Sequence, residues 1–181
     1  NGSNLKNLEP CKKAPTWIGI DIDAADDLTF YKIRKAKLSE VIDGTKFAID
    51  KFKPMGTQFT LKYLLTDYNN TENHIVSAIR LGKELGFDEF FIRVAWLGNN
   101  HYVIPLLGAD EKPIKDKYDE MKDLVTETCT EVGLTPIIGS YKHIHYIFEK
   151  GVGDQLVRRC YAPLFLPVFG ADGSIWFCCE N

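Results

Sequence analysis

An alternation of strand and helix patterns in the first half of the chain constrains the fold more than any other feature. The expected elements are, in order, strand 16–23, a helix from Asp26 or Asp27 through about Phe52, strand 58–66, helix 71–85 and strand 89–97. Short connections between alternating strands and helices favour parallel strands joined by right-handed crossovers. We therefore expect an α/β fold whose three strands lie side by side in chain order, with their helices on one face.

The rest of the chain predicts a linker and a small separate piece. Pro113 can begin a helix that runs through Val132, and residues 135–139 form a short strand candidate. Two apolar runs, 164–169 and 174–177, flank a Gly/Asp-rich connection and predict a β-hairpin. We place the boundary so that residues 1–140 form one domain and residues 141–181 begin another.

Composition excludes several classes of protein. The chain has 181 residues, of which 45% are apolar, and this is enough for one sizeable core. The net charge of −3 and the absence of a basic run argue against a nucleic-acid partner. No apolar run approaches the roughly 20 residues of a membrane span. Five cysteines at irregular spacings, two of them adjacent, favour a reducing, cytoplasmic setting. The chain begins with Asn, so we expect a fragment of a longer protein.

Charged residues at alternating strand positions mark a candidate site. If apolar residues face the helices, Asp21, Asp23, Lys62 and Arg93 point to the opposite face. Lys62 and Arg93 lie between large apolar residues, where an unpaired buried charge is costly. One interpretation is a structural ion pair with Asp21 or Asp23. The other is a polar pocket for a charged ligand at the carboxyl ends of the strands, and both can hold together.

Two further polar residues have ordinary interpretations. Arg34 belongs to a Lys/Arg-rich helical turn, which is usually a solvated face. Asn70 precedes the 71–85 helix and is first a capping candidate.

The C-terminal cysteines suggest metal binding. The predicted hairpin carries Cys160 at its entry and Cys178 at its exit, and two thiols on one hairpin make half of a four-thiolate site. His143 or His145 could complete a structural zinc site with them, which gives the alternative hypothesis of a non-enzymatic α/β binding module. Neighbouring strand residues point to opposite faces, so Cys179 is not expected to share the metal with Cys178.

Several motifs resemble radical S-adenosylmethionine (SAM) enzymes. Residues 17–34, Trp-Ile-Gly-Ile-Asp-Ile-Asp through Tyr-Lys-Ile-Arg, are similar to the fourth strand and following helix of that family. Asn1-Gly2-Ser3 resembles the turn after its third strand, 64–72 its fifth strand and turn, and 83–90 the approach to its sixth. The spacing Cys160-x12-Gly173-x4-Cys178 resembles the opening of the SPASM extension, which binds auxiliary iron–sulfur clusters.

The resemblance implies a fold, an activity and a set of site residues. The fold would be the C-terminal half of a partial (β/α)6 TIM-like barrel, followed by the start of a small cysteine-bearing β-hairpin domain. The full-length enzyme would cleave SAM reductively with a 4Fe–4S cluster and abstract hydrogen from a peptide or small-molecule substrate. An external donor such as flavodoxin or ferredoxin would supply the electron. If the chain has this activity, we expect Asp21, Asp23, Lys62, Asn70 and Arg93, with Arg34 as a further candidate, to bind SAM or substrate, and Cys160 and Cys178 to hold an auxiliary cluster.

The chain also departs from the family pattern. It contains no Cys-x3-Cys-x2-Cys motif for the SAM cluster, and the later SPASM cysteines are missing. We therefore expect this chain alone to be inactive. Sulfatase-maturing members have an Asp after the second hairpin cysteine, where this chain has Cys179, a hydrogen-donor candidate that can equally be a packing residue.

Overall fold

The computed structural model describes residues 2–66, 68–94, 114–139, 168–169 and 175–176. The chain divides into two compact units, Asn1–Tyr141 and Lys142–Asn181. The first unit contains η1 (Leu5–Leu8), β1 (Trp17–Asp21), α1 (Asp27–Arg34), α2 (Leu38–Phe52), η2 (Lys53–Met55), β2 (Gln58–Leu65), α3 (Glu72–Leu85), β3 (Glu89–Val94), α4 (Ile114–Val132) and β4 (Thr135–Ile138).

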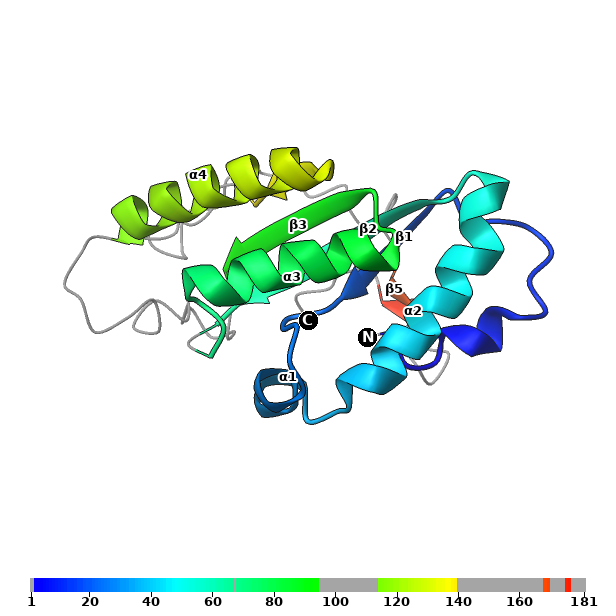
Figure 1. The fold of residues 1–181 in the computed structure, drawn as a ribbon. Coiled ribbons are helices and arrows are strands. Elements are labelled where there is room, and N and C mark those ends of the chain that lie inside the picture. The colour runs from blue at the N-terminus through cyan, green and yellow to red at the C-terminus, as the bar shows by residue number, and fades with distance from the viewer. Residues whose placement is uncertain (1, 67, 95–113, 140–167, 170–174, 177–181) are drawn as a thin grey trace. The chain divides into compact units, whose positions relative to one another are not determined.

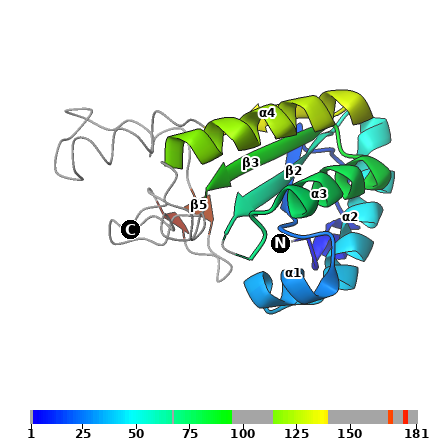
Figure 2. The ribbon, with the colours of Figure 1, turned by 60° about the vertical axis from the view of Figure 1, so that its left-hand side comes forward.

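A four-stranded sheet with the order β1-β2-β3-β4 forms the centre of this unit, and all of its pairings are parallel. The expected order and direction of the first three strands are therefore confirmed, and β4 adds a fourth strand beside β3. Figures 1 and 2 show α2, α3 and α4 on the same side of the sheet. A right-handed crossover at every step in one direction across the sheet produces this one-sided arrangement.

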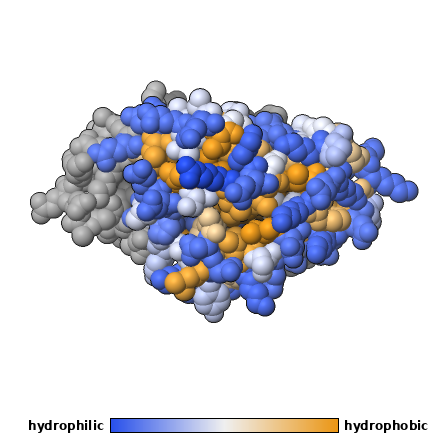
Figure 3. Space-filling model, viewed as in Figure 1, coloured by the Kyte–Doolittle hydropathy of each residue, from blue (hydrophilic) through white to orange (hydrophobic). Residues whose placement is uncertain are grey.

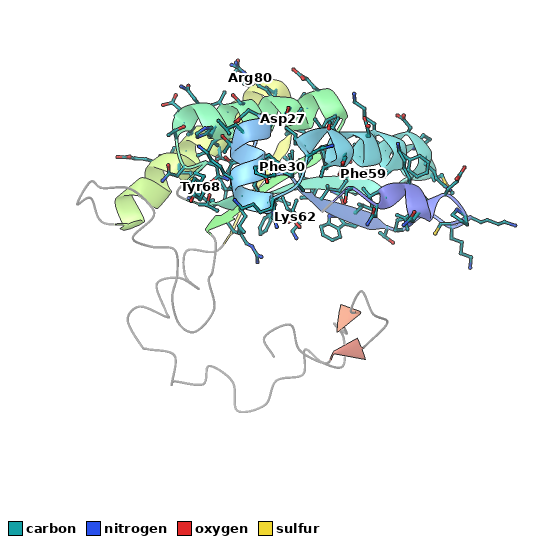
Figure 4. The ribbon with its side chains drawn as sticks, turned by 90° about the horizontal axis from the view of Figure 1, so that it is seen from below. Asp27, Phe30, Phe59, Lys62, Tyr68 and Arg80 are labelled. Carbon is teal, nitrogen blue, oxygen red and sulfur yellow. The ribbon has the colours of Figure 1, made fainter. Side chains whose placement is uncertain are left out.

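Apolar side chains fill the space between the sheet and its helices. The fully or nearly fully buried set includes Ile20 on β1 and Ile22 just after that strand, Phe59, Leu61, Tyr63 and Leu65 on β2, and Phe90 and Ile92 on β3. They occupy alternate positions, so the intervening residues face the other side of the sheet. Lys62 is one of these, and Figure 4 shows it on the side of the sheet away from α2, α3 and α4.

The expected single helix from Asp26 or Asp27 through Phe52 is wrong, because the structure has two helices there. Asp26 caps α1, as its side chain accepts a 2.8 Å hydrogen bond from the backbone N–H of Thr29. Lys35 then ends α1 in a left-handed conformation with φ of 54°. No Gly or Pro marks the break. The turn brings α2 back across the sheet, where it buries Leu38, Val41, Gly44, Thr45, Ala48, Ile49 and Phe52. The apolar surface buried this way outweighs the cost of one left-handed lysine.

The expected capping role of Asn70 is wrong, because the N-cap of α3 is Thr71, whose side chain accepts a hydrogen bond from the backbone N–H of His74. At the other end Gly86 ends α3 with φ of 92°. Gly133 follows α4 with φ of 73°. Gly44 lies inside α2 because the chain near Gly2 packs directly against it, and a Cβ at position 44 would overlap the carbonyl oxygen of Gly2.

In the second unit, β5 (Val168–Phe169) pairs antiparallel with β6 (Ile175–Trp176). The pairing lies within the predicted hairpin. Cys160, Cys178 and Cys179 are outside the described residues, so their assignment stays a prediction, as does that of His143 and His145. Across the described part of the chain, no helix is long and apolar enough to cross a membrane.

Candidate functional site

A small polar pocket opens where β1, β2 and β3 reach their carboxyl ends. Its volume is about 130 Å³, and it is lined by Asp21, Arg34, Lys62, Tyr63, Leu64, Phe91 and Arg93. Asp21 ends β1, the lining residues of β2 lie in its second half, and those of β3 are Phe91 near its middle and Arg93 next to its end. Ligands of parallel α/β folds bind at this edge, because the loops and helix starts that follow the strands meet there. Four residues that the sequence analysis selected thus share one pocket.

Asp21 and Lys62 form an ion pair across the first two strands. The two residues are partners in the β1–β2 register, and Lys62 Nζ lies 3.2 Å from Asp21 Oδ1. Both side chains are about 30% exposed, so water and ligands can reach the pair. The predicted structural ion pair is therefore present, and it lies on the wall of a pocket.

Asp23 is fully buried and forms the second charged pair, with Arg34. Its Oδ2 accepts a hydrogen bond from Arg34 Nε, and its Oδ1 accepts a 2.7 Å hydrogen bond from the backbone N–H of Leu64. Burial raises the pKa of Asp23 above its ordinary value, although Arg34 and the Leu64 N–H act in the opposite direction. With both oxygens engaged inside the protein, Asp23 holds Arg34 at the pocket and does not itself face a ligand.

Arg34 differs from the solvated helix residue that its basic neighbours suggest. The early end of α1 allows its side chain to fold back to Asp23, and it lines the pocket with 28% of the side chain exposed. The pairing depends on the break after Arg34, which the sequence pattern does not reveal.

Asn69 holds the ends of β1 and β2 together, and sequence analysis missed it in favour of its neighbour Asn70. The buried Asn69 side chain donates hydrogen bonds to the carbonyl oxygens of Asp23 at 2.8 Å and Leu64 at 2.9 Å. Its Oδ1 accepts from the backbone N–H of Thr66 at 2.6 Å. Asn70 is partly exposed and outside the pocket lining. The Asn-Asn pair signals a polar turn, but which of the two points inward depends on the turn backbone.

Arg93 supplies the charge that the pocket leaves uncompensated. It is exposed, and among the described residues no carboxylate forms an ion pair with it. Asp21 balances Lys62 and Asp23 balances Arg34, so the pocket has one excess positive charge at Arg93. The arrangement favours an anionic group at this end of the sheet.

A second, shallower hollow lies on the outside of α1. Asp27, Leu28, Tyr31, Ala36, Lys37 and Ser39 line a space of about 470 Å³, with Leu28 65% exposed and Tyr31 56% exposed. Figure 3 shows apolar surface interrupting the polar surface on the side of the molecule that faces the viewer. This hollow contains no converging polar groups comparable to those of the strand-end pocket.

Metal ligands are not gathered in the part of the chain that the structure describes, where no group of three or more His, Cys, Asp or Glu residues could hold an ion. Cys129 is buried, which raises its thiol pKa to about 12 and makes it unreactive.

No family model matches the chain, and no curated protein or solved structure matches it either.

Proposed function

We propose that this chain is the C-terminal portion of a radical SAM enzyme with a SPASM extension. Its strand-end pocket would form part of the SAM and substrate site. The observation that carries the proposal is the meeting of Asp21, Arg34, Lys62 and Arg93 in one pocket at the carboxyl ends of parallel strands. Strand alternation selected Asp21, Lys62 and Arg93, and the motif at residues 17–34 adds Arg34, so these residues come from segments far apart in the sequence.

The one-sided parallel sheet supports the same proposal. A barrel keeps its helices outside and its ligand inside, and α2, α3 and α4 of the described residues lie on the same face of the sheet, as in the wall of a barrel. The strand pairing β1-β2-β3-β4 without a reversal also fits successive strands of a barrel wall. A doubly wound sheet would reverse its strand order at the site and put helices on both faces.

The pocket fits the charged end of a ligand. Its volume of about 130 Å³ is below the range of about 300–1,000 Å³ for whole drug-sized ligands, so a complete SAM molecule would extend beyond it. Lys62, Arg34 and Arg93 are suited to a carboxylate, and Asp21 to a hydroxyl or ammonium group. SAM and its cluster, when bound, supply a 5′-deoxyadenosyl radical that abstracts hydrogen from the substrate. The side chains of the pocket orient the ligands and limit the access of water.

The proposal assigns the second unit to an auxiliary iron–sulfur cluster. The antiparallel pair β5 and β6 lies between Cys160 and Cys178 in the sequence. Cysteine thiolates are the usual ligands of such clusters, and a 4Fe–4S cluster needs about four. The other ligands would come from the remainder of the extension.

The test is anaerobic reconstitution of the full-length protein with iron and sulfide, followed by SAM and a reductant. We expect a brown protein that releases 5′-deoxyadenosine. Cys178→Ala should lower the iron content, whereas its matched neighbour Cys179→Ala should leave it unchanged. A colourless full-length protein with one bound zinc and no SAM cleavage would instead establish the zinc-binding module.

A further inference from the structure

The pocket has a charge asymmetry that the proposed function does not explain. On β1 and β2 its charged side chains are paired, because Asp21 and Lys62 neutralise each other at 3.2 Å. On β3 the pattern stops, because Arg93 has no ion-pair partner in the described residues. An arginine is always protonated in a protein, so this end of the pocket keeps its positive charge.

The backbone beside Arg93 leaves room for its side chain. Gly139 follows β4 and donates a 2.8 Å hydrogen bond from its N–H to the carbonyl oxygen of Ile92. A Cβ at position 139 would lie 2.9 Å from the Cβ of Arg93, so any larger residue would push the arginine stem away. Gly139 thus allows Arg93 to lie along the sheet at the rim of the pocket.

The same side of the pocket is apolar next to the arginine. Phe91 lies two residues before Arg93 on the same face of β3, and Leu64 is the register partner of Arg93 on β2. Both line the pocket and are partly exposed. Ile137, also partly exposed, continues this row on β4 as the partner of Phe91.

From this juxtaposition we infer that Arg93 is the anchor for a carboxylate that is carried on an apolar body, with the body packing on Phe91 and Leu64. This inference deepens the proposed function and rests on it, since it gives the substrate class of the same pocket. The carboxylate would receive two parallel hydrogen bonds from the planar guanidinium, a geometry that lysine cannot offer. Hydrophobic N-acyl amino acids and peptide C-termini have this chemistry.

The excess charge selects among possible anions. Asp21, Arg34, Lys62 and Arg93 together with Asp23 sum to +1, from three cations and two carboxylates. A monoanionic carboxylate neutralises this charge, whereas a phosphate dianion overshoots it. The amino-acid end of SAM carries an ammonium group beside its carboxylate, so it brings no net negative charge to neutralise the excess at Arg93. The carboxylate is therefore assigned to the substrate rather than to the cofactor.

The test uses the 181-residue chain, without iron or SAM. N-acetyl-L-leucinate is titrated into ¹⁵N-labelled protein, with N-acetyl-L-leucinamide as the matched neutral probe, and the amide signals of Phe91, Arg93 and Gly139 are followed. We expect the carboxylate to bind at least tenfold more tightly than the amide. Inorganic phosphate and S-adenosylhomocysteine should each bind more weakly than N-acetyl-L-leucinate.

Variants then identify the anchor. Arg93→Gln should weaken N-acetyl-L-leucinate binding roughly tenfold to a hundredfold, the effect of losing a charge-assisted hydrogen-bonded pair, with no change in melting temperature. Arg93→Lys should recover part of the affinity. Arg80→Gln is the control, because Arg80 is exposed on α3 and lies on the helix side of the sheet in Figure 4. It should bind like the wild type.

Several results would overturn the inference. Equal binding of the carboxylate and the amide, or no saturable binding of either, would show that no carboxylate anchor exists. An Arg93→Gln variant that binds normally but melts earlier would make Arg93 structural. Tighter binding of phosphate or S-adenosylhomocysteine would give the site to a different ligand. None of these results depends on radical chemistry, so a failure of SAM cleavage in the full-length protein would refute the proposed function separately.

Discussion

Replacement of Asn69 by Ala should destabilise the first unit more than any other single polar-to-alanine change near the pocket. The side chain is fully buried and bonds to three backbone groups, the carbonyl oxygens of Asp23 and Leu64 and the N–H of Thr66. Alanine cannot replace any of these bonds. The strand ends that frame the pocket would lose their connection.

The magnitude follows from the groups that are left without a partner. A buried backbone group that loses its hydrogen bond costs about 1–3 kcal/mol. The N–H of Thr66 and the carbonyl of Asp23 depend on Asn69 most directly, so we expect a loss of about 2–4 kcal/mol in the free energy of unfolding. This is a large share of the roughly 5–15 kcal/mol that stabilises a typical domain.

Urea unfolding of the 181-residue chain, followed by far-UV circular dichroism, measures this loss. Asn73→Ala is the matched control, because Asn73 is exposed on α3, and its change should stay within about 0.5 kcal/mol. Asn69→Asp keeps the acceptor for Thr66 but removes both donors, so it should also destabilise. A loss below about 1 kcal/mol for Asn69→Ala would refute the argument that this residue joins β1 and β2.

Three further predictions concern stability. Gly44→Ala should cost about 1–3 kcal/mol in urea unfolding, because the new Cβ overlaps the Gly2 carbonyl and overpacking outweighs the better helix propensity of alanine. An unchanged or raised stability would show that the chain at Gly2 moves away freely. The pKa of Asp23 is raised in the folded state, so this group should make the free energy of unfolding decrease as pH rises from its ordinary pKa of 3.8 through the folded value. Urea titrations at several pH values should show that Asp23→Asn removes this decrease, and an identical pH dependence in the variant would contradict the assignment. Asp26→Ala removes the cap of α1 and should cost about 1 kcal/mol by the same assay at neutral pH. The pKa of Asp26 is lowered because hydrogen bonds from Thr29 outweigh the opposing effect of burial, so its contribution should be lost as pH falls through the folded value.

The strand alternation and the helix-end residues of the sequence predicted much of the fold. Period-two alternation separates the buried Leu61 and Tyr63 from Lys62 between them, and this fixed which face Lys62 occupies. Glycines at the ends of α3 and α4 provided the left-handed residues that such ends favour, as Gly86 and Gly133 show. These features are local, so a sequence window contains the information that determines them.

The position of the break between α1 and α2 depends on long-range packing, so it cannot be predicted from the residues next to it in the sequence. Lys35 is an ordinary helix former, and it adopts a left-handed conformation because α2 gains more by crossing the sheet. The Asp23–Arg34 pair is a consequence of that break. Alternation predicted an ion pair of Lys62 or Arg93 with Asp21 or Asp23 and left the partners open. The strand register of the structure, which places Asp21 opposite Lys62, decides the partner of Lys62.

The residues that support the pocket differ from those that line it, and this has a consequence for protein engineering. Asp23 and Asn69 are fully buried and hold the strand ends in place, whereas Lys62, Leu64, Phe91 and Arg93 are at least partly exposed and face the pocket. A library that varies only positions 62, 64, 91 and 93 therefore explores new ligand preferences on an unchanged frame. Reversing the charge at Arg93 in such a library, together with a smaller residue at Phe91, would turn the pocket toward amines with bulkier side chains. Most members should remain folded, because surface substitutions away from buried networks seldom cost more than about 0.5 kcal/mol.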